Sequence, residues 1–234
     1  MASTTYQVNI GISEATLTAL ANSGFYLYGF KAVSSSDQAA RPLVWLQTPN
    51  CAQTTIVAWS NEFEAFISDS TVNSNDEIIV GTSVAILLGQ TWQVESSAGG
   101  PVFADGSQAG ISILNQTSQP LACGISEKLN GSALQVCASP LNGNGLSVIV
   151  PLDKLILLFS TISVPAGSVI DGAFSLSGPG AYTSAILVDL TDDAYRSVNF
   201  DINEGWNWGG YAWARQISSN SSVVPYLIHN PSSH

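Results

Sequence analysis

Apolar and polar residues alternate with a period of two along most of this chain, which is typical of β-strands with one buried face. One run puts five apolar residues on a single face: Val57, Trp59, Phe63, Ala65 and Ile67. A second run does the same: Val84, Ile86, Leu88, Trp92 and Val94. Further candidate strands cover residues 25–33, 43–47, 111–113, 146–150, 155–159, 186–190 and 198–202, with turn-forming clusters at 34–37, 73–76, 98–101, 142–145 and 177–180. About ten strands and almost no helix predict an all-β fold, an antiparallel β-sandwich or barrel.

One segment near the N-terminus departs from this alternation. Ser13 is a suitable N-cap, Glu14 places a negative charge in the first turn, and Gly24 follows the end of the pattern. The apolar residues that share one helical face are Leu17, Leu20 and Ala21. We therefore expect one short N-terminal helix. Since no repeat and no long linker interrupts the chain, we expect a single domain over residues 1–234.

The charge balance bears on which partners the chain can have. Seventeen acidic residues outnumber six basic ones, for a formal net charge of −11, and the basic residues are scattered singly. Nucleic-acid binding depends on clustered lysine and arginine that release counterions from phosphates, so we expect no nucleic-acid partner. Attraction to anionic lipid is disfavoured for the same reason.

Targeting signals are not evident in the sequence. Residues 1–11 contain neither the basic region nor the apolar region of a signal peptide, so we expect no secretory leader. No run of about 18 apolar residues occurs, so we expect no transmembrane segment. These features predict a protein that stays in the cytoplasm or is released without a signal peptide.

Histidine is scarce, which argues against most acid–base and nucleophilic enzymes. His229 and His234 lie at the C-terminal end, where chains are usually frayed. A serine or cysteine nucleophile needs a base held rigidly beside it, and a zinc site needs His and Cys at ligand spacing. Two carboxylates could still cleave a glycoside, but Glu62 and Glu64, neighbours on a polar strand face, are most simply solvated. We therefore expect no catalytic centre.

Oxygen ligands are densest towards the C-terminus, where Asp192, Asp193 and Asp201 could surround a calcium ion. We favour turn-forming and surface roles for these carboxylates and expect no cofactor. Cys123 and Cys137 could form a disulfide across a short loop, which would stabilise the fold by about 3 kcal/mol. With three cysteines and no leader, we favour reduced, mostly buried thiols.

Residues 201–215, the aromatic segment, contain three of the six tryptophans and two consecutive glycines, Gly209 and Gly210. A Gly-Gly step between extended runs predicts a two-residue hairpin, because both glycines can take the positive φ of a type I′ turn. The resulting register pairs Trp208 with Tyr211, Trp206 with Trp213, Glu204 with Arg215, and Ile202 with Ile217. Alternation puts all eight side chains on one face of the ribbon.

The aromatic side chains of this ribbon have two interpretations. They could be core residues covered by another sheet, as we expect for Trp45, Trp59 and Trp92 on well-alternating strands. Alternatively, the charged pair between the isoleucines and the aromatic residues could mark the edge of the core, leaving an exposed aromatic tip. In that case the candidate ligand-binding residues are Trp206, Trp208, Tyr211, Trp213, Asn203 and Asn207.

The combination of clustered tryptophan, abundant Asn, Ser, Thr and Gly, and few basic residues favours a non-enzymatic recognition protein. We expect it to bind a neutral carbohydrate by stacking sugar rings on the aromatic tip. One alternative is a cytolysin-like protein that binds lipid head groups through Trp and Tyr and inserts the apolar residues 155–164. Another is a structural protein that assembles into homo-oligomers through edge strands.

Overall fold

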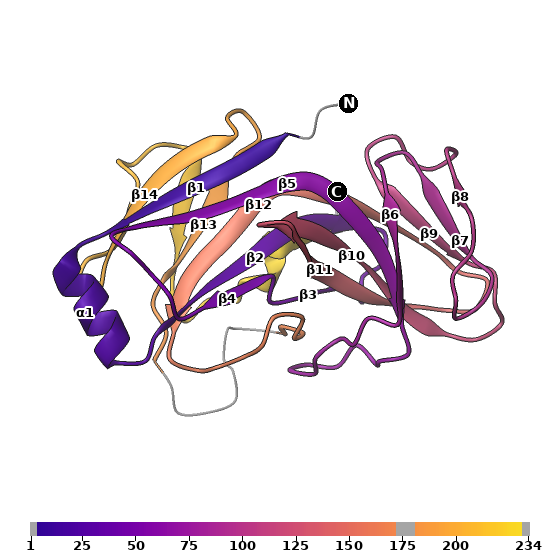
Figure 1. Ribbon diagram of the computed structural model, residues 1–234, viewed down its shortest axis with the longest axis horizontal. Helices are drawn as coiled ribbons and strands as arrows, with labels where there is room; N and C mark the ends of the chain where they lie inside the picture. Colours follow the sequence, from indigo (N-terminus) through magenta and orange to yellow (C-terminus); the bar gives the residue numbers. More distant parts are fainter. Residues whose placement is uncertain (1–3, 172–180, 231–234) are drawn as a thin grey trace.

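In the computed structural model, which describes residues 4–171 and 181–230, the chain folds into two curled β-sheets (Figure 1). The first sheet has eight strands, in the order β15 (Gly205–Asn207), β14 (Tyr195–Asp201), β1 (Thr5–Ile12), β5 (Thr54–Ser68), β10 (Leu121–Leu129), β11 (Ser132–Leu141) and β3 (Arg41–Pro42), with β6 (Thr82–Ile86) on β5. The all-β prediction is confirmed. The predicted turn at 177–180 lies outside the described residues.

The second sheet has nine strands. Its main path is β16 (Ala214–Ile217), β13 (Ala185–Asp189), β12 (Leu146–Ser160), β9 (Ile111–Asn115), β7 (Thr91–Val94) and β8 (Val102–Phe103). β2 (Tyr26–Ser35) pairs with β12 and carries β4 (Leu46–Thr48) and β17 (Ile228–His229). The count of about ten strands was too low because many edge strands have only two to five residues. Pairing is mostly antiparallel, but β1–β14, β7–β9 and β2–β17 are parallel.

One large hydrophobic core joins the two sheets. It takes side chains from β1, β5 and β10 of the first sheet and from β2, β9 and β12 of the second. The three tryptophans assigned to the core, Trp45, Trp59 and Trp92, are each at most 2% exposed, which confirms that prediction.

β12 is a central strand with both faces covered. Leu155, Leu157 and Phe159 pack into the large core, while Ile156 and Leu158 pack into a second cluster on the opposite face. The sequence predicted two strands here, and the structure has one strand whose register on β2 shifts between Pro151 and Leu155. The apolar residues 155–159 are thus already buried in the folded protein.

The apolar run from Val84 to Val94 is two strands and not one. β6 pairs with β5 in the first sheet, whereas β7 pairs with β9 in the second. Gly89, with φ +84°, lies in the connection, and Leu87 and Leu88 are exposed there. The length of the turn happens to keep the apolar residues in step, so the alternating pattern does not show that β6 and β7 are separate strands in different sheets.

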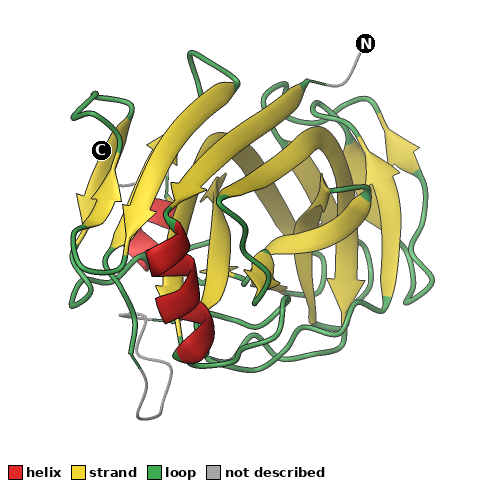
Figure 2. Ribbon diagram, turned by 60° about the vertical axis from the view of Figure 1, so that its left-hand side comes forward, coloured by secondary structure: helices red, strands yellow, loops and turns green. Residues whose placement is uncertain are grey.

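The expected N-terminal helix is confirmed as α1 (Glu14–Asn22), which lies beside the strands at one end of the molecule (Figure 2). The Ser13 hydroxyl accepts a hydrogen bond from the Thr16 backbone N–H, and Gly24 follows with φ +69°. Leu20 is buried as predicted, but Ala21 is exposed and Thr16 is buried in its place. The buried face is rotated because the Thr16 hydroxyl bonds the Asp201 carboxylate at 2.8 Å.

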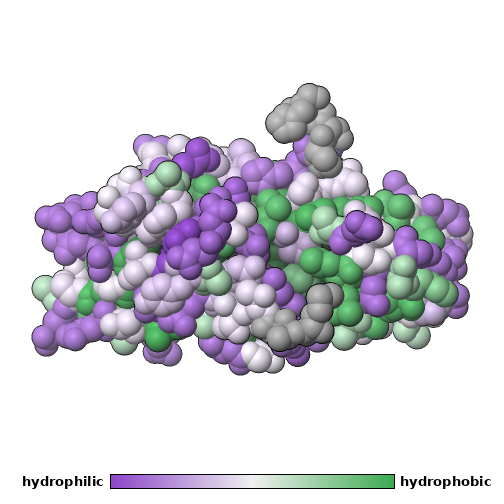
Figure 3. Space-filling model, turned by 90° about the horizontal axis from the view of Figure 1, so that it is seen from above, coloured by the Kyte–Doolittle hydropathy of each residue, from purple (hydrophilic) through white to green (hydrophobic). Residues whose placement is uncertain are grey.

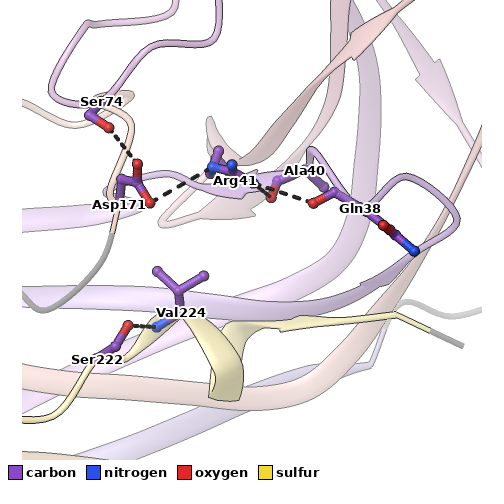
Figure 4. Close-up of polar contacts among 7 residues, drawn as sticks. All are labelled: Gln38, Ala40, Arg41, Ser74, Asp171, Ser222 and Val224. Carbon is purple, nitrogen blue, oxygen red and sulfur yellow. Dashed lines mark hydrogen bonds and ion pairs between the residues drawn. The ribbon is translucent and has the colours of Figure 1, made fainter. Parts of the chain in front are cut away.

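Polar contacts tie the loops beneath the sheets to strand β3 (Figure 4). Asp171 accepts a hydrogen bond from the Ser74 hydroxyl at 2.7 Å and forms a long ion pair with Arg41 at 4.0 Å. Arg41 also donates to the carbonyl oxygens of Ala40 and Gln38. A separate contact lies at the start of α2 (Val224–Leu227), where the Val224 backbone N–H donates to the Ser222 hydroxyl at 3.3 Å.

Strands β10 and β11 form a two-residue hairpin, closed by Asn130 and Gly131 with φ of +50° and +84°. Gly124 in β10 lies against the carbonyl oxygen of Cys137 and the ring of the buried Phe66. Any side chain at this position would collide with the neighbouring strand, so the absence of a Cβ permits the close approach.

Gly124→Ala is expected to lower the free energy of unfolding by about 1–3 kcal/mol, the usual cost of overpacking. Its Cβ would stand 2.5 Å from Cζ of Phe66, and the Cys137 carbonyl could move away only with its strand. Gly81→Ala is the matched control, because its Cβ would meet only the Ile67 carbonyl oxygen at 3.4 Å. Urea denaturation measures both, and equal midpoints for the two variants would contradict this packing.

Candidate functional site

The aromatic segment does not form the predicted hairpin. Its first arm is β15, which pairs with β14 so that Trp206 lies opposite Phe200. Its second arm is β16, which pairs with β13 in the other sheet, where Arg215 lies opposite Leu187. The predicted pairs Trp206–Trp213, Glu204–Arg215, Ile202–Ile217 and Trp208–Tyr211 are therefore wrong as strand register.

The physical reason is a competing turn at residues 201–205. The Asp201 carboxylate accepts hydrogen bonds from the backbone N–H groups of Asn203 and Glu204, and Gly205 completes the reversal with φ +83°. This turn brings Trp206 back over the core, where its ring lies 5.8 Å from that of Phe159 and 4.9 Å from that of Phe200. Burial of the Trp206 indole against two phenyl rings outweighs the preference of the Gly-Gly step for closing a hairpin.

The two glycines do adopt positive φ, as expected, with +74° at both Gly209 and Gly210. They turn the chain out of the first sheet and towards the second. In this turn the indole N–H of Trp208 donates to the Tyr211 carbonyl oxygen at 2.9 Å, and the Asn207 amide oxygen accepts from the Gly209 N–H at 3.0 Å. The loop that carries Trp208 is therefore held by its own side chains.

A cleft of about 590 Å³ opens where β1, β14 and β15 end beside the start of α1. Its volume lies within the range of about 300–1,000 Å³ that is usual for small-molecule sites. The lining residues are Gly11, Ile12, Ser13, Asn199, Phe200, Asp201, Glu204, Gly205, Trp206, Asn207, Trp208 and Gly210. Three of the predicted ligand-binding residues, Trp206, Trp208 and Asn207, thus meet at this cleft.

The three do not contribute in the same way. Trp206 is only 4% exposed, and its indole N–H donates to the Ser184 carbonyl oxygen, so it belongs to the core beneath the cleft. Trp208 is half-buried and offers part of its indole to the cleft. Asn207 is exposed on the outer side of β15. Each interpretation of the aromatic segment therefore holds for one tryptophan: Trp206 lies in the core, and Trp208 lies at the surface.

The remaining predicted residues lie outside the cleft lining. Asn203 is exposed in the turn between β14 and β15. Tyr211 and Trp213 stack on each other at 6.2 Å, and the Arg196 guanidinium covers Trp213 at 5.1 Å. Tyr211 is 64% exposed, so this stack is a separate aromatic surface next to the cleft.

Asn199 and Gly11 belong to the cleft but were missed from the sequence. Gly11 on β1 lies opposite Asn199 on β14, and the Asn199 amide occupies the space that a side chain at Gly11 would need. Asn207 lies opposite Asn199 on the other side. Alternation with the buried Val198 and Phe200 does place Asn199 outward, but only the strand pairing shows what it adjoins.

Two carboxylates, Asp201 and Glu204, give the cleft its charge. Hydrogen bonds from the Asn203 backbone N–H and then from the Thr16 hydroxyl hold the pKa of Asp201 below its usual value. Asp201 is therefore an anion at neutral pH, and its hydrogen bonds serve the turn and helix α1. A carboxylate fixed in this way can accept hydrogen bonds but is a poor proton donor.

The aspartates considered for calcium do not gather. Asp193 forms an ion pair with Arg196 at 2.9 Å and accepts from the Tyr195 N–H, while Asp201 serves the turn. Across residues 4–171 and 181–230, no three His, Cys, Asp or Glu side chains converge closely enough to hold a metal ion. We therefore assign no metal ligand in this part of the chain.

The thiols and the histidine have structural surroundings. Cys123 and Cys137 are free and buried, and desolvation raises the pKa of these thiols to about 11 and about 12. Cys51 is free and half-buried. His229 is exposed and its ring contacts the Tyr226 carbonyl oxygen, while His234 lies outside the described residues. No described helix is long and apolar enough to cross a membrane.

Comparison of this chain with protein-family models, with curated proteins and with solved structures gives no match.

Proposed function

We propose that the protein is a non-enzymatic recognition protein that binds a neutral carbohydrate in the cleft beside Trp208. The observation that carries this proposal is the meeting of one half-exposed indole with two amide side chains, Asn199 and Asn207, in a cleft of suitable size. Indole faces stack on the apolar faces of sugar rings, and amides and carboxylates bond sugar hydroxyls.

The charge of the cleft narrows the ligand class. Its titratable lining residues are Asp201 and Glu204, and no lysine or arginine is among the lining residues. Phosphorylated or carboxylated ligands would meet carboxylates and find no cation to pair with, which is unfavourable. The hydroxyl groups of a neutral sugar can donate hydrogen bonds to the same carboxylates.

The scaffold suits this role. We infer that the two curled sheets, joined by one core, form a sandwich-like framework whose strand ends hold the cleft rigidly. Sites on rigid strands lose less entropy on binding than sites on mobile loops. Catalysis is not part of the proposal, and Asp201, which hydrogen bonds hold as an anion, is unsuited to be the protonated acid that glycoside cleavage needs.

Trp208→Ala is expected to weaken binding of a neutral glycan by about 30-fold, or about 2 kcal/mol, as is usual for truncation of a central tryptophan. A glycan array would select the probe, and titration calorimetry would measure the affinity. Trp208→Phe should keep most of the affinity because it keeps a ring. Tyr211→Ala is the matched control, since Tyr211 is exposed beside the cleft without lining it. Equal affinity of Trp208→Ala and wild type would refute the proposal.

A second candidate function, binding to a neutral lipid surface, is favoured by exposed apolar side chains at the opposite end of the molecule. Leu87, Leu88 and Phe103 are between 42% and 65% exposed there. Insertion of residues 155–164, however, would require removing the central strand β12 from both hydrophobic clusters. Flotation with neutral liposomes tests this candidate, and leakage would indicate cytolysin-like activity. Molar mass at two concentrations tests the self-assembling alternative.

A further inference from the structure

The cleft continues onto an open face of the first sheet. Alternation along β1 and β14 turns one set of side chains inward to the core and the other outward. The outward set comprises Thr5, Gln7, Asn9 and Gly11 on β1, Tyr195, Ser197, Asn199 and Asp201 on β14, and Gly205 and Asn207 on β15. Figure 3, which looks onto the top of the molecule, shows hydrophilic and intermediate residues over its left half and more hydrophobic ones over its right half.

Asp201, where the face meets the cleft, is the one charged residue of this outward set, although the protein carries seventeen acidic residues. An exposed sheet face that only contacts water usually carries Lys, Glu and other charged side chains. Apart from Asp201, the polar groups are amides and hydroxyls, which can both donate and accept hydrogen bonds. Such a face is suited to a ligand that presents many hydroxyl groups and no charge.

Hydrogen bonds already order part of this face. The Gln7 amide nitrogen donates to the Asn9 amide oxygen at 2.6 Å, and the Asn9 amide nitrogen donates to the Tyr195 hydroxyl at 2.6 Å. Tyr195 nevertheless remains 50% exposed. An aromatic ring that is held in place and still open to solvent loses little freedom when a ligand stacks on it.

Tyr195 and Trp208 lie at opposite ends of the surface that the face and the cleft form together. Tyr195 precedes Asn199 by four residues on β14, and a strand rises about 3.3 Å per residue, so they are about 13 Å apart along the sheet. Asn199 borders the cleft that holds Trp208. A single sugar ring in the cleft cannot reach Tyr195, whereas a chain of several rings can.

We propose that the cleft and this face form one extended site for a linear, neutral oligosaccharide, with Trp208 and Tyr195 as its two stacking positions. The amides of Asn9 and Asn199 lie between them and bond hydroxyls of the intervening rings. This inference rests on the proposed function, because it extends the same site. It adds that the ligand is a chain and that Tyr195 selects for its length.

The test compares ligand lengths by titration calorimetry. The probes are glucose, galactose and N-acetylglucosamine, each as the monosaccharide and as a linear tri- and hexasaccharide. Wild type is expected to bind the hexasaccharide of its preferred sugar at least about tenfold more tightly than the monosaccharide. Tyr195→Ala should abolish that gain and leave monosaccharide affinity unchanged, and Tyr195→Phe should retain most of it because the ring remains.

The outcomes separate the two proposals. If Tyr195→Ala binds the hexasaccharide like wild type, or if affinity does not depend on length, the extended site is wrong while carbohydrate binding in the cleft still stands. If Trp208→Ala binds every probe like wild type, or if wild type binds none of them, both proposals fail. Tyr211→Ala serves as the matched tyrosine control and should behave like wild type with every probe, because Tyr211 lies outside the face.

Discussion

Glu127→Ala is expected to lower the free energy of unfolding by about 3–5 kcal/mol, because it leaves a buried ammonium group without its partner. Lys31 on β2 and Glu127 on β10 are 1% and 2% exposed, and Nζ lies 3.2 Å from Oε2. The ammonium also lies 4.2 Å from the ring centre of Trp59 and 5.7 Å from that of Trp45. The pair thus joins the two sheets within the aromatic part of the core.

A double variant separates the pair from its individual charges. Removing both charges with Lys31→Met and Glu127→Leu should restore most of the stability, because a buried ion pair is often no better than apolar residues of similar volume. Chemical denaturation followed by circular dichroism would measure both variants. If the double variant is as unstable as Glu127→Ala alone, the loss arises from packing and not from the unpaired charge.

The loss in Glu127→Ala should also depend on pH. Desolvation lowers the pKa of Lys31 in the folded protein, and without Glu127 the opposing attraction is gone. A lysine whose folded pKa lies below its unfolded value of about 10.4 costs stability at neutral pH, and that cost declines as pH rises towards about 10.4. The stability difference between Glu127→Ala and wild type should therefore shrink between pH 7 and pH 10. A difference that grows over this range would contradict the argument.

Two glycine-containing turns show how far local sequence predicts this fold. Asn130-Gly131 and Gly209-Gly210 both adopt positive φ. Only the first closes a two-residue hairpin, with Leu129 opposite Ser132 and a ladder that continues to Leu141. Its arms can stay together because both belong to the first sheet, whereas the arms around Gly209 each find partners in a different sheet.

Strand identity and core tryptophans could be predicted because alternation and burial are local properties. Sheet membership could not, since it depends on contacts between residues far apart in sequence. The candidate site illustrates the limit, because it needs the parallel pairing of β1 with β14, which brings Asn9 to Tyr195 across 186 residues. No local pattern in the first strand indicates that its neighbour is near the C-terminus.

The turn at residues 201–205 is the one local signal that would have corrected the hairpin. Asp201 followed by Asn203 and Gly205 carries the side-chain acceptor and the positive-φ residue that a tight turn needs. Gly209 and Gly210 also satisfy the geometry of a turn, but they do not determine which strands the flanking residues pair with. A reversal at residues 201–205 in place of 209–210 moves Trp206 from an exposed tip to the core.

Trp206→Ala is therefore expected to lower the free energy of unfolding by about 3–5 kcal/mol, the usual cost of truncating a buried aromatic residue. It would remove the contacts with Phe159 and Phe200 and leave the Ser184 carbonyl oxygen without its indole donor. Trp206→Phe keeps a ring and should lose less, mainly the hydrogen bond, at about 1–3 kcal/mol. Thermal and urea denaturation would measure these differences.

Comparison with Trp208→Ala makes this a test of the whole site. Trp208 is half-buried, so its truncation should change stability less than that of Trp206, while changing glycan affinity more than Trp206→Phe does. This crossed pattern follows only if one tryptophan supports the cleft from the core and the other faces the ligand. If both tryptophans instead affected binding strongly and stability weakly, Trp206 would have to be exposed, and the pairing of β14 with β15 would be wrong.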